Sequence, residues 1–198
     1  MDAAAWTDRF AEETENLRAG LEAADAPTAD NIVRGIEPIW WRQRRYLEGI
    51  HWQETARKKA EQAGDTYRAA VLRLTEELFR HNLGQPHQAR TVFAVAIALT
   101  LERGEKESVV YLLHSLACLE RNDGELNRAA DTMRRGTFLA AEVNAGKESN
   151  GLQAYQWRGM AQIDIACQRF KEAESLCHRA LAVYRKEQNV IQEMMTLR

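Results

Sequence analysis

The stretch YQWRGMAQIDIACQRFKEAESLCHRALAVYRKE, residues 155–187, decides the fold because it contains two helical patterns joined by a short turn. The first pattern aligns four apolar residues along one stripe of a helix with about 3.6 residues per turn: Trp157, Met160, Ala161 and Ile165. After a turn at residues 168–169, the second pattern repeats the spacing with Phe170, Ala173, Cys177, Ala180, Leu181 and Tyr184. Helices with matching apolar stripes bury them against each other, so the stretch predicts an antiparallel helix pair.

This pair resembles a tetratricopeptide repeat. Ala173 and Ala180 match the family's two small positions in the second helix, where a methyl side chain lets two helix backbones approach closely. Trp157, Ala161 and Phe170 match its tryptophan, first small and aromatic positions, whereas Asp164 stands where a tyrosine is expected. The resemblance implies a helical-repeat architecture with a binding role.

Glycines repeat upstream of this pair with a regular period. Gly64, Gly84, Gly104, Gly124 and Gly146 are separated by 20, 20, 20 and 22 residues, and each is expected to end a helix. The predicted helix pairs are 27–63, 64–103, 104–145 and 146–188, with a leading helix in 1–26 and the start of a further or capping helix in 189–198. The fold class predicted is therefore all-α: a single domain, 1–198, forming a right-handed α-α superhelix, a tetratricopeptide-like solenoid with a repeat of about 40 residues.

The first two pairs are less regular than the last two. We expect an N-cap in residues 28–31, a kink or break near Pro38, and a turn into the next helix at Gly49. If Ala89 sets the register of the second pair, charged residues such as Glu76 and Glu77 occupy packing positions. The apolar residues of the same helix require a register about one residue away.

Composition excludes several classes of protein. The formal net charge of −2 argues against a chain that coats nucleic acid or an anionic membrane. No apolar run reaches the roughly 20 residues needed to cross a bilayer, and no signal sequence is recognisable. Three cysteines without framework spacing indicate reduced thiols, so we expect a cytoplasmic protein.

Two further segments carry a more specific resemblance. Residues 15–19 (ENLRA) and the aromatic helix at residues 40–49, together with the later G-x-x-x-x-A turns, are similar to the repeat arm of bacterial signal-transduction ATPases and LuxR-type transcriptional regulators of the maltose-activator kind. The resemblance implies a protein-protein interaction or ligand-sensing domain of a bacterial transcriptional regulator. The alternatives are a stand-alone adaptor that binds a peptide or protein, and a HEAT-like or RNA-binding helical array.

Stacked pairs of this kind build a concave wall from their first helices. By resemblance to peptide-binding repeats, the binding positions on that wall are Tyr111, His114, Cys118, Arg121, Tyr155, Arg158 and Gln162. Tyrosine and arginine offer large contact areas and bind carboxylates or amides, so the expected partner is a protein or peptide, with a small-molecule effector as an alternative. We expect Arg158→Ala or Tyr155→Ala to weaken partner binding and to leave thermal stability nearly unchanged.

Other candidate sites are weaker. Trp41, Arg42 and Arg45 combine aromatic and basic side chains in a way that suits single-stranded nucleic acid, but packing of the tryptophans at one end of the solenoid is the favoured interpretation. Residues 146–149 (GKES) lack the first glycine and the preceding strand of a phosphate-binding loop. We expect no enzyme activity, no catalytic residue, no cofactor and no metal site, and self-association through the apolar residues after Asn189 is a further expectation.

Overall fold

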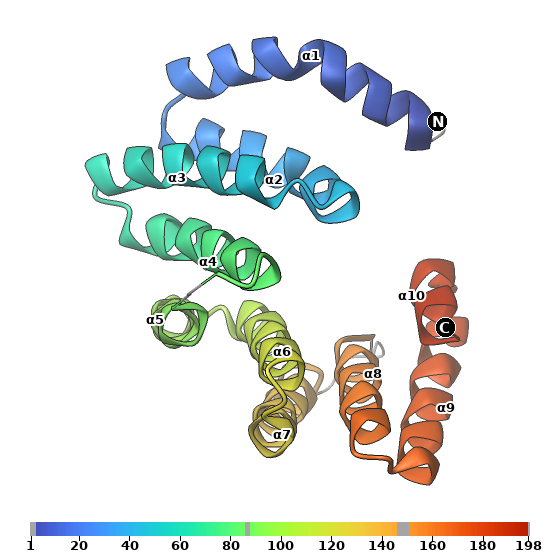
Figure 1. Cartoon of the computed structure of the whole chain (residues 1–198). Coiled ribbons are helices and arrows are strands. Elements are labelled where there is room, and N and C mark those ends of the chain that lie inside the picture. The colour runs from blue at the N-terminus through green and yellow to red at the C-terminus, as the bar shows by residue number, and fades with distance from the viewer. Residues whose placement is uncertain (1–2, 86–87, 146–150, 198) are drawn as a thin grey trace. The chain divides into compact units, whose positions relative to one another are not determined.

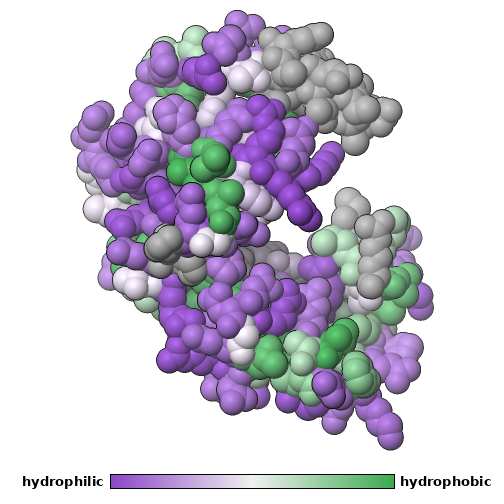
Figure 2. Space-filling view, in the orientation of Figure 1, coloured by the Kyte–Doolittle hydropathy of each residue, from purple (hydrophilic) through white to green (hydrophobic). Residues whose placement is uncertain are grey.

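The computed structural model describes residues 3–85, 88–145 and 151–197, and within these ranges it contains helices and no strand (Figure 1). The helices are α1 (Ala3–Ala23), α2 (Ala26–Gln43), α3 (Tyr46–Gln62), α4 (Thr66–Asn82), α5 (Ala89–Glu102), α6 (Lys106–Asn122), α7 (Leu126–Val143), α8 (Gly151–Ala166), α9 (Phe170–Lys186) and α10 (Val190–Thr196). Neighbours in sequence pack against each other, which confirms the predicted all-helical solenoid class. The face seen in Figure 2 is mostly hydrophilic, with hydrophobic surface in small areas.

The chain divides into two compact units, Met1–Ala96 and Ile97–Arg198. The core of the first unit forms around rings from three helices. Trp40 and Trp52 lie with their ring centroids 5.8 Å apart, and Phe79 meets Trp40 edge-on at 6.3 Å. All three side chains are fully buried, so the first unit has an aromatic core of its own.

Glycines end the helices as the period predicts. Gly64, Gly84, Gly104 and Gly124 have φ between 66° and 80°, the left-handed region that closes a helix C-terminus. The expected equivalent at Gly146 lies outside the described residues. At the α8–α9 turn Gln168 takes the same conformation with φ 60°, so this turn is present without a glycine.

The first pair differs from the sequence prediction in three places. The N-cap of α2 is Asp25, whose carboxylate accepts a hydrogen bond from the Thr28 backbone N–H at 2.9 Å. Helix α2 continues through Pro38 and ends only at Gln43, and the turn is made by Arg44 with φ 56°. Gly49 therefore lies inside α3, not in a turn.

Gly49 is explained by packing. A Cβ atom at this position would lie 2.5 Å from Cε2 of Phe79, whose ring also contacts Trp40, Trp41 and Tyr46. The absence of a side chain lets α3 and α4 approach closely. Gly35 in α2 is different, because a Cβ there would meet no atom within 4 Å.

These two glycines make a matched pair of predictions. We expect Gly35→Ala to stabilise the protein by about 1 kcal/mol, because alanine lowers the entropy cost of forming a helix. Gly49→Ala gains the same propensity but forces the Phe79 ring to move, and such overpacking costs roughly 1–3 kcal/mol, so we expect a net loss of stability. Urea denaturation of both variants gives the comparison. Equal stabilisation by the two alanines would show that the α3–α4 contact is loose.

The fourth pair also needs a correction. Ile165 and Phe170, which the pattern assigns to the packed stripe, are 52% and 63% exposed. Helix α8 contacts α7 on one side and α9 on the other, so it buries more than one stripe. Its fully buried apolar residues are Ala154, Ala161 and Ile163, and Ile163 packs with Ala117, Ala129 and Met133 of the preceding pair.

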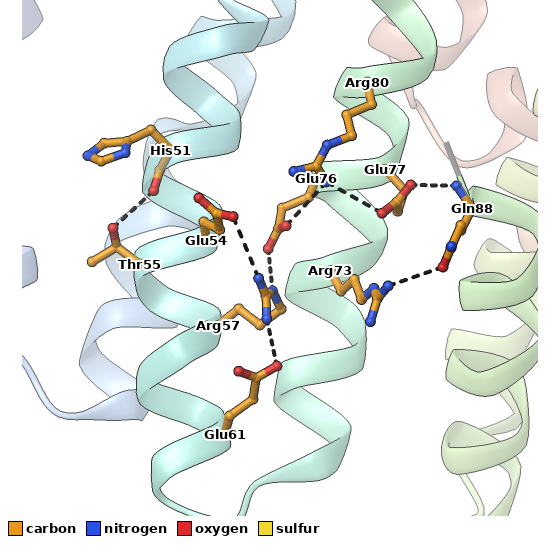
Figure 3. Close-up of polar contacts among 10 residues, drawn as sticks. All are labelled: His51, Glu54, Thr55, Arg57, Glu61, Arg73, Glu76, Glu77, Arg80 and Gln88. Carbon is orange, nitrogen blue, oxygen red and sulfur yellow. Dashed lines mark hydrogen bonds and ion pairs between the residues drawn. The ribbon is translucent and has the colours of Figure 1, made fainter. Parts of the chain in front are cut away.

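In the second pair both candidate registers contribute buried residues. Leu72, Leu74 and Phe79 are buried in α4, and so are Glu76 and Glu77, at 2% and 5% exposure. Arg57 donates to Glu76 at 2.6 Å from the neighbouring α3, and Arg80 lies 3.4 Å from both carboxylates (Figure 3). Glu77 also accepts a hydrogen bond of 2.6 Å from the Gln88 backbone N–H. Charged residues are tolerated at packing positions here because every buried carboxylate has an arginine beside it.

Candidate functional site

The first helices of the last two pairs, α6 and α8, contact each other in the second unit. The seven residues that the sequence predicts for the binding wall lie on these two helices, and we call this surface the α6–α8 wall. The structure brings them together in two groups. One group is centred on Tyr155 and the other on Arg121.

Aromatic contacts hold the first group. The imidazole of His114 stacks on the ring of Tyr155, with centroids 3.9 Å apart and an interplanar angle of 27°. The ring of Tyr111 lies 5.4 Å from that of Tyr155 and is tilted by 59°. Tyr111 is 45% exposed and Tyr155 is half-buried, so the aromatic group reaches from the interior to solvent.

The second group is polar. Arg121 donates a hydrogen bond of 2.5 Å to the side-chain carbonyl of Gln162, which ties α6 to α8 at the other end of the wall. Cys118 lies between the groups on α6 and is half-buried. Burial raises the pKa of the Cys118 thiol, whereas the charges of Arg121 and Arg158 act in the opposite sense.

Two wall residues are more deeply buried than outward positions should be. His114 is 6% exposed and Arg158 is 8% exposed. A Cβ on Gly159 would lie 2.6 Å from Cε1 of His114, so the imidazole occupies space that this glycine leaves free. Both residues are therefore packed into the wall, and the expectation that Arg158→Ala leaves stability unchanged does not suit a side chain this buried.

Arg158 has an unusual environment for a buried arginine. Its guanidinium carbon lies 5.2 Å from the centroid of the Tyr155 ring, within the range of a cation–π contact. Its Nε is buried without a hydrogen-bond partner, and none of the described carboxylates forms an ion pair with it. The contrast with Glu76, which has two arginine neighbours, makes Arg158 a buried charge without compensation.

The histidine reports the same electrostatics. Burial lowers the pKa of His114 to about 3, and the positive charges of Arg158 and Arg121 lower it further. The imidazole is therefore neutral near pH 7. Its Nδ1 is buried and has no hydrogen-bond partner among the described residues.

This pKa predicts a pH dependence of stability. The ordinary pKa of 6.5 applies in the unfolded chain, so between pH 6.5 and about 3 the unfolded chain binds more protons than the folded one. The stability that neutral His114 contributes is complete above pH 6.5 and is lost as the pH falls, by about 2 kcal/mol between pH 7 and pH 5. Urea denaturation at the two pH values measures the loss, and His114→Asn should remove it. An unchanged slope in the variant would assign the effect to other groups.

The basic and aromatic residues of the first pair do not form a stacking surface. The Trp41 ring packs against Phe79, with centroids 4.7 Å apart, and its Nε1 donates to Glu37 at 3.0 Å. Arg45 pairs with Glu48 at 2.5 Å, and Arg42 is exposed. This placement agrees with the packing interpretation of these residues.

A cavity of about 540 Å³ lies beside the wall, within the second unit. Its lining residues come from five helices and the turns at their ends: Glu107, Tyr111, Asn144, Gly151, Leu152, Tyr155, Tyr184, Asn189 and Gln192. Sequence reasoning named Tyr111 and Tyr155 as binding residues and Tyr184 as a core residue, and missed the others. No local pattern could have grouped them, because they are up to 85 residues apart, from Glu107 to Gln192.

Two searches concern other kinds of site. Within the described residues, no three His, Cys, Asp or Glu side chains are grouped closely enough to hold a metal ion. Residues 146–149, which superficially resemble a phosphate-binding loop, lie outside the described ranges. Of the helices that the structure describes, none combines the length and hydropathy of a bilayer-crossing segment.

Comparisons with known proteins identify the fold. The sequence matches no protein-family model and no curated protein. Among solved structures, the chain is similar to the crystal structure of BtubC (BKLC) from P. vanneervenii, with a TM-score of 0.71 and 16% sequence identity. The similarity covers 91% of this chain and 75% of that chain. At this identity it shows a shared helical-repeat fold, and the fold alone does not assign a function.

Proposed function

We propose that the chain is a non-enzymatic binding protein whose α6–α8 wall binds a carboxylate of a peptide or protein segment. The observation that carries the proposal is the buried guanidinium of Arg158 without a described anionic partner. A buried charge of this kind is costly unless it is paired, and arginine cannot lose its charge by deprotonation. An incoming carboxylate would provide the missing charge and accept hydrogen bonds from the guanidinium.

The neighbours of Arg158 support a peptide as the source of the carboxylate. Tyr111 and Tyr155 present aromatic surface next to it, and Arg121 adds a second positive charge on the same wall. Tyrosine and arginine are typical anchor residues of protein interfaces. An acidic side chain flanked by apolar or polar residues fits this combination.

The test is a binding titration with synthetic peptides. Acetylated, fluorescein-labelled peptides that carry a fixed glutamate among randomised neighbours are compared with the same peptides carrying glutamine there. We expect glutamate-dependent binding that weakens as salt increases, and that Arg158→Met weakens by about 30-fold or more, the effect of removing one member of a buried charge pair. Binding that ignores both changes would contradict the proposal.

A second candidate function is the sensing arm of a bacterial transcriptional regulator, as the resemblance to maltose-activator-like proteins implies. The observation that favours it is apolar surface on α10, also visible over α9 and α10 in Figure 2. Val190, Met194, Met195 and Leu197 are all more than half exposed. Such a face suits a further helix or a second copy, and light scattering of the chain and of Met194→Glu tests self-association.

A further inference from the structure

The cavity beside the α6–α8 wall has a size and lining that indicate a ligand site. Its volume of about 540 Å³ lies within the range of roughly 300–1,000 Å³ that small-ligand pockets occupy. Tyr111 and Tyr155 belong both to the wall and to the lining, so the cavity continues from the surface that we propose binds a peptide.

Three polar atoms of the lining are buried and have no hydrogen-bond partner. They are the hydroxyl oxygen of Tyr184, the side-chain Nδ2 of Asn144 and the side-chain Oε1 of Gln192. The Tyr184 side chain is 99% buried, since its exposure is 1%. Buried polar groups are almost always hydrogen-bonded, so three such groups around one cavity indicate an occupant that completes them.

The chemistry of these atoms defines the occupant. Asn144 offers a donor, Gln192 offers an acceptor, and the Tyr184 hydroxyl can do either. Burial raises the pKa of Tyr184 to about 12, so its hydroxyl is neutral near pH 7. A group with both a carbonyl oxygen and an N–H₂ satisfies this set, because its oxygen accepts from Asn144 and its nitrogen donates to Gln192 and Tyr184.

Other side chains fit less well. A carboxylate has no hydrogen to donate to Gln192, and Glu107, which also lines the cavity, repels it. An aliphatic side chain fills the space but leaves three buried polar groups without partners. A site built to hydrogen-bond a ligand discriminates strongly against an analogue that lacks the polar group.

We propose that this cavity binds the carboxamide side chain of a glutamine or asparagine in the same peptide whose carboxylate pairs with Arg158. The inference rests on the proposed function, since it names a second determinant of the same peptide. The wall then selects an acidic residue and the cavity selects a neutral amide at a fixed distance from it.

The experiment uses the full chain and a scanned peptide series. Each acetylated, fluorescein-labelled heptapeptide amide has one fixed glutamate, and one glutamine is moved through the remaining positions, with methionine and glutamate at the same position as comparisons. We expect glutamine to bind about tenfold more tightly than methionine at one spacing, the effect of one or more buried hydrogen bonds. Fluorescence polarisation gives the dissociation constants.

Two variants separate the cavity from the wall. Tyr184→Phe keeps the ring and removes the hydroxyl, and Gln192→Met keeps the length and removes the amide. We expect each to reduce the preference for glutamine over methionine to about twofold or less and to keep glutamate-dependent binding, while circular dichroism confirms the fold. Glutamate-dependent binding without any glutamine preference overturns the inference and leaves the proposed function standing. The absence of all glutamate-dependent binding overturns both.

Discussion

Arg57→Met is expected to destabilise the protein by about 3 kcal/mol at pH 7, because it removes one member of a buried charge pair. The partner is Glu76, whose side chain is 2% exposed and accepts from Arg57 Nε at 2.6 Å (Figure 3). Burial raises the pKa of Glu76, and Arg57 opposes that rise, so the variant should raise the pKa further. A raised pKa means that ionised Glu76 costs stability at pH 7 and that the cost disappears as the pH falls below the ordinary value of 4.5. The loss measured by urea denaturation should therefore shrink as the pH is lowered from 7 toward 4.5.

The double variant Arg57→Met with Glu76→Met provides the control. Replacement of both charges by apolar side chains of similar length is often neutral or stabilising, so most of the lost stability should return. Arg80 keeps a carboxylate neighbour in this variant, because Glu77 lies 3.4 Å from it. Additive losses in the two single variants and the double variant would show that Arg57 and Glu76 are not energetically coupled.

The positions of the later turns were predictable from the sequence because they depend on local chemistry. Glycines at a regular period adopt the left-handed conformation at four helix ends, as residues without Cβ readily do. The first pair was harder, because its turn is made by Arg44 and its glycine at residue 49 serves a tertiary contact with Phe79. A glycine required by packing and a glycine required by a turn are the same letter, and only the neighbouring helix distinguishes them.

The candidate site was predictable in part for a similar reason. Helical periodicity places Tyr111, His114 and Cys118 on one face of α6, and the structure keeps His114 and Tyr111 next to Tyr155 of α8. Periodicity does not show depth, so the burial of His114 and Arg158 was missed. The cavity was missed altogether, because its polar atoms come from separate helices and meet only after the pairs have packed.

Arg158→Met is expected to have opposite effects on stability and on binding. Methionine retains much of the packing volume and removes a buried charge that none of the described carboxylates compensates, so we expect unfolding to require about 1–2 kcal/mol more free energy. The cation–π contact with Tyr155, 5.2 Å from the ring centroid, is lost and reduces this gain by about 0.5–1 kcal/mol. The same variant should lose glutamate-dependent peptide binding. Such a trade of stability for function is typical of binding sites that are kept ready for a charged ligand.

Arg179→Met is the matched control for this prediction. Arg179 also lies over an aromatic ring of the fourth pair, with its guanidinium carbon 4.1 Å from the centroid of Trp157, but its side chain is exposed. An exposed charge is solvated, so this variant should change stability by less than about 1 kcal/mol in the destabilising direction and leave peptide binding intact. In Arg158→Met, the pKa of His114 should also rise from its low value, because one of the two positive charges that lower it is gone. A titration of the His114 imidazole by NMR measures that rise. Loss of stability in Arg158→Met with unchanged peptide binding would instead make Arg158 a structural residue, satisfied by its contact with Tyr155.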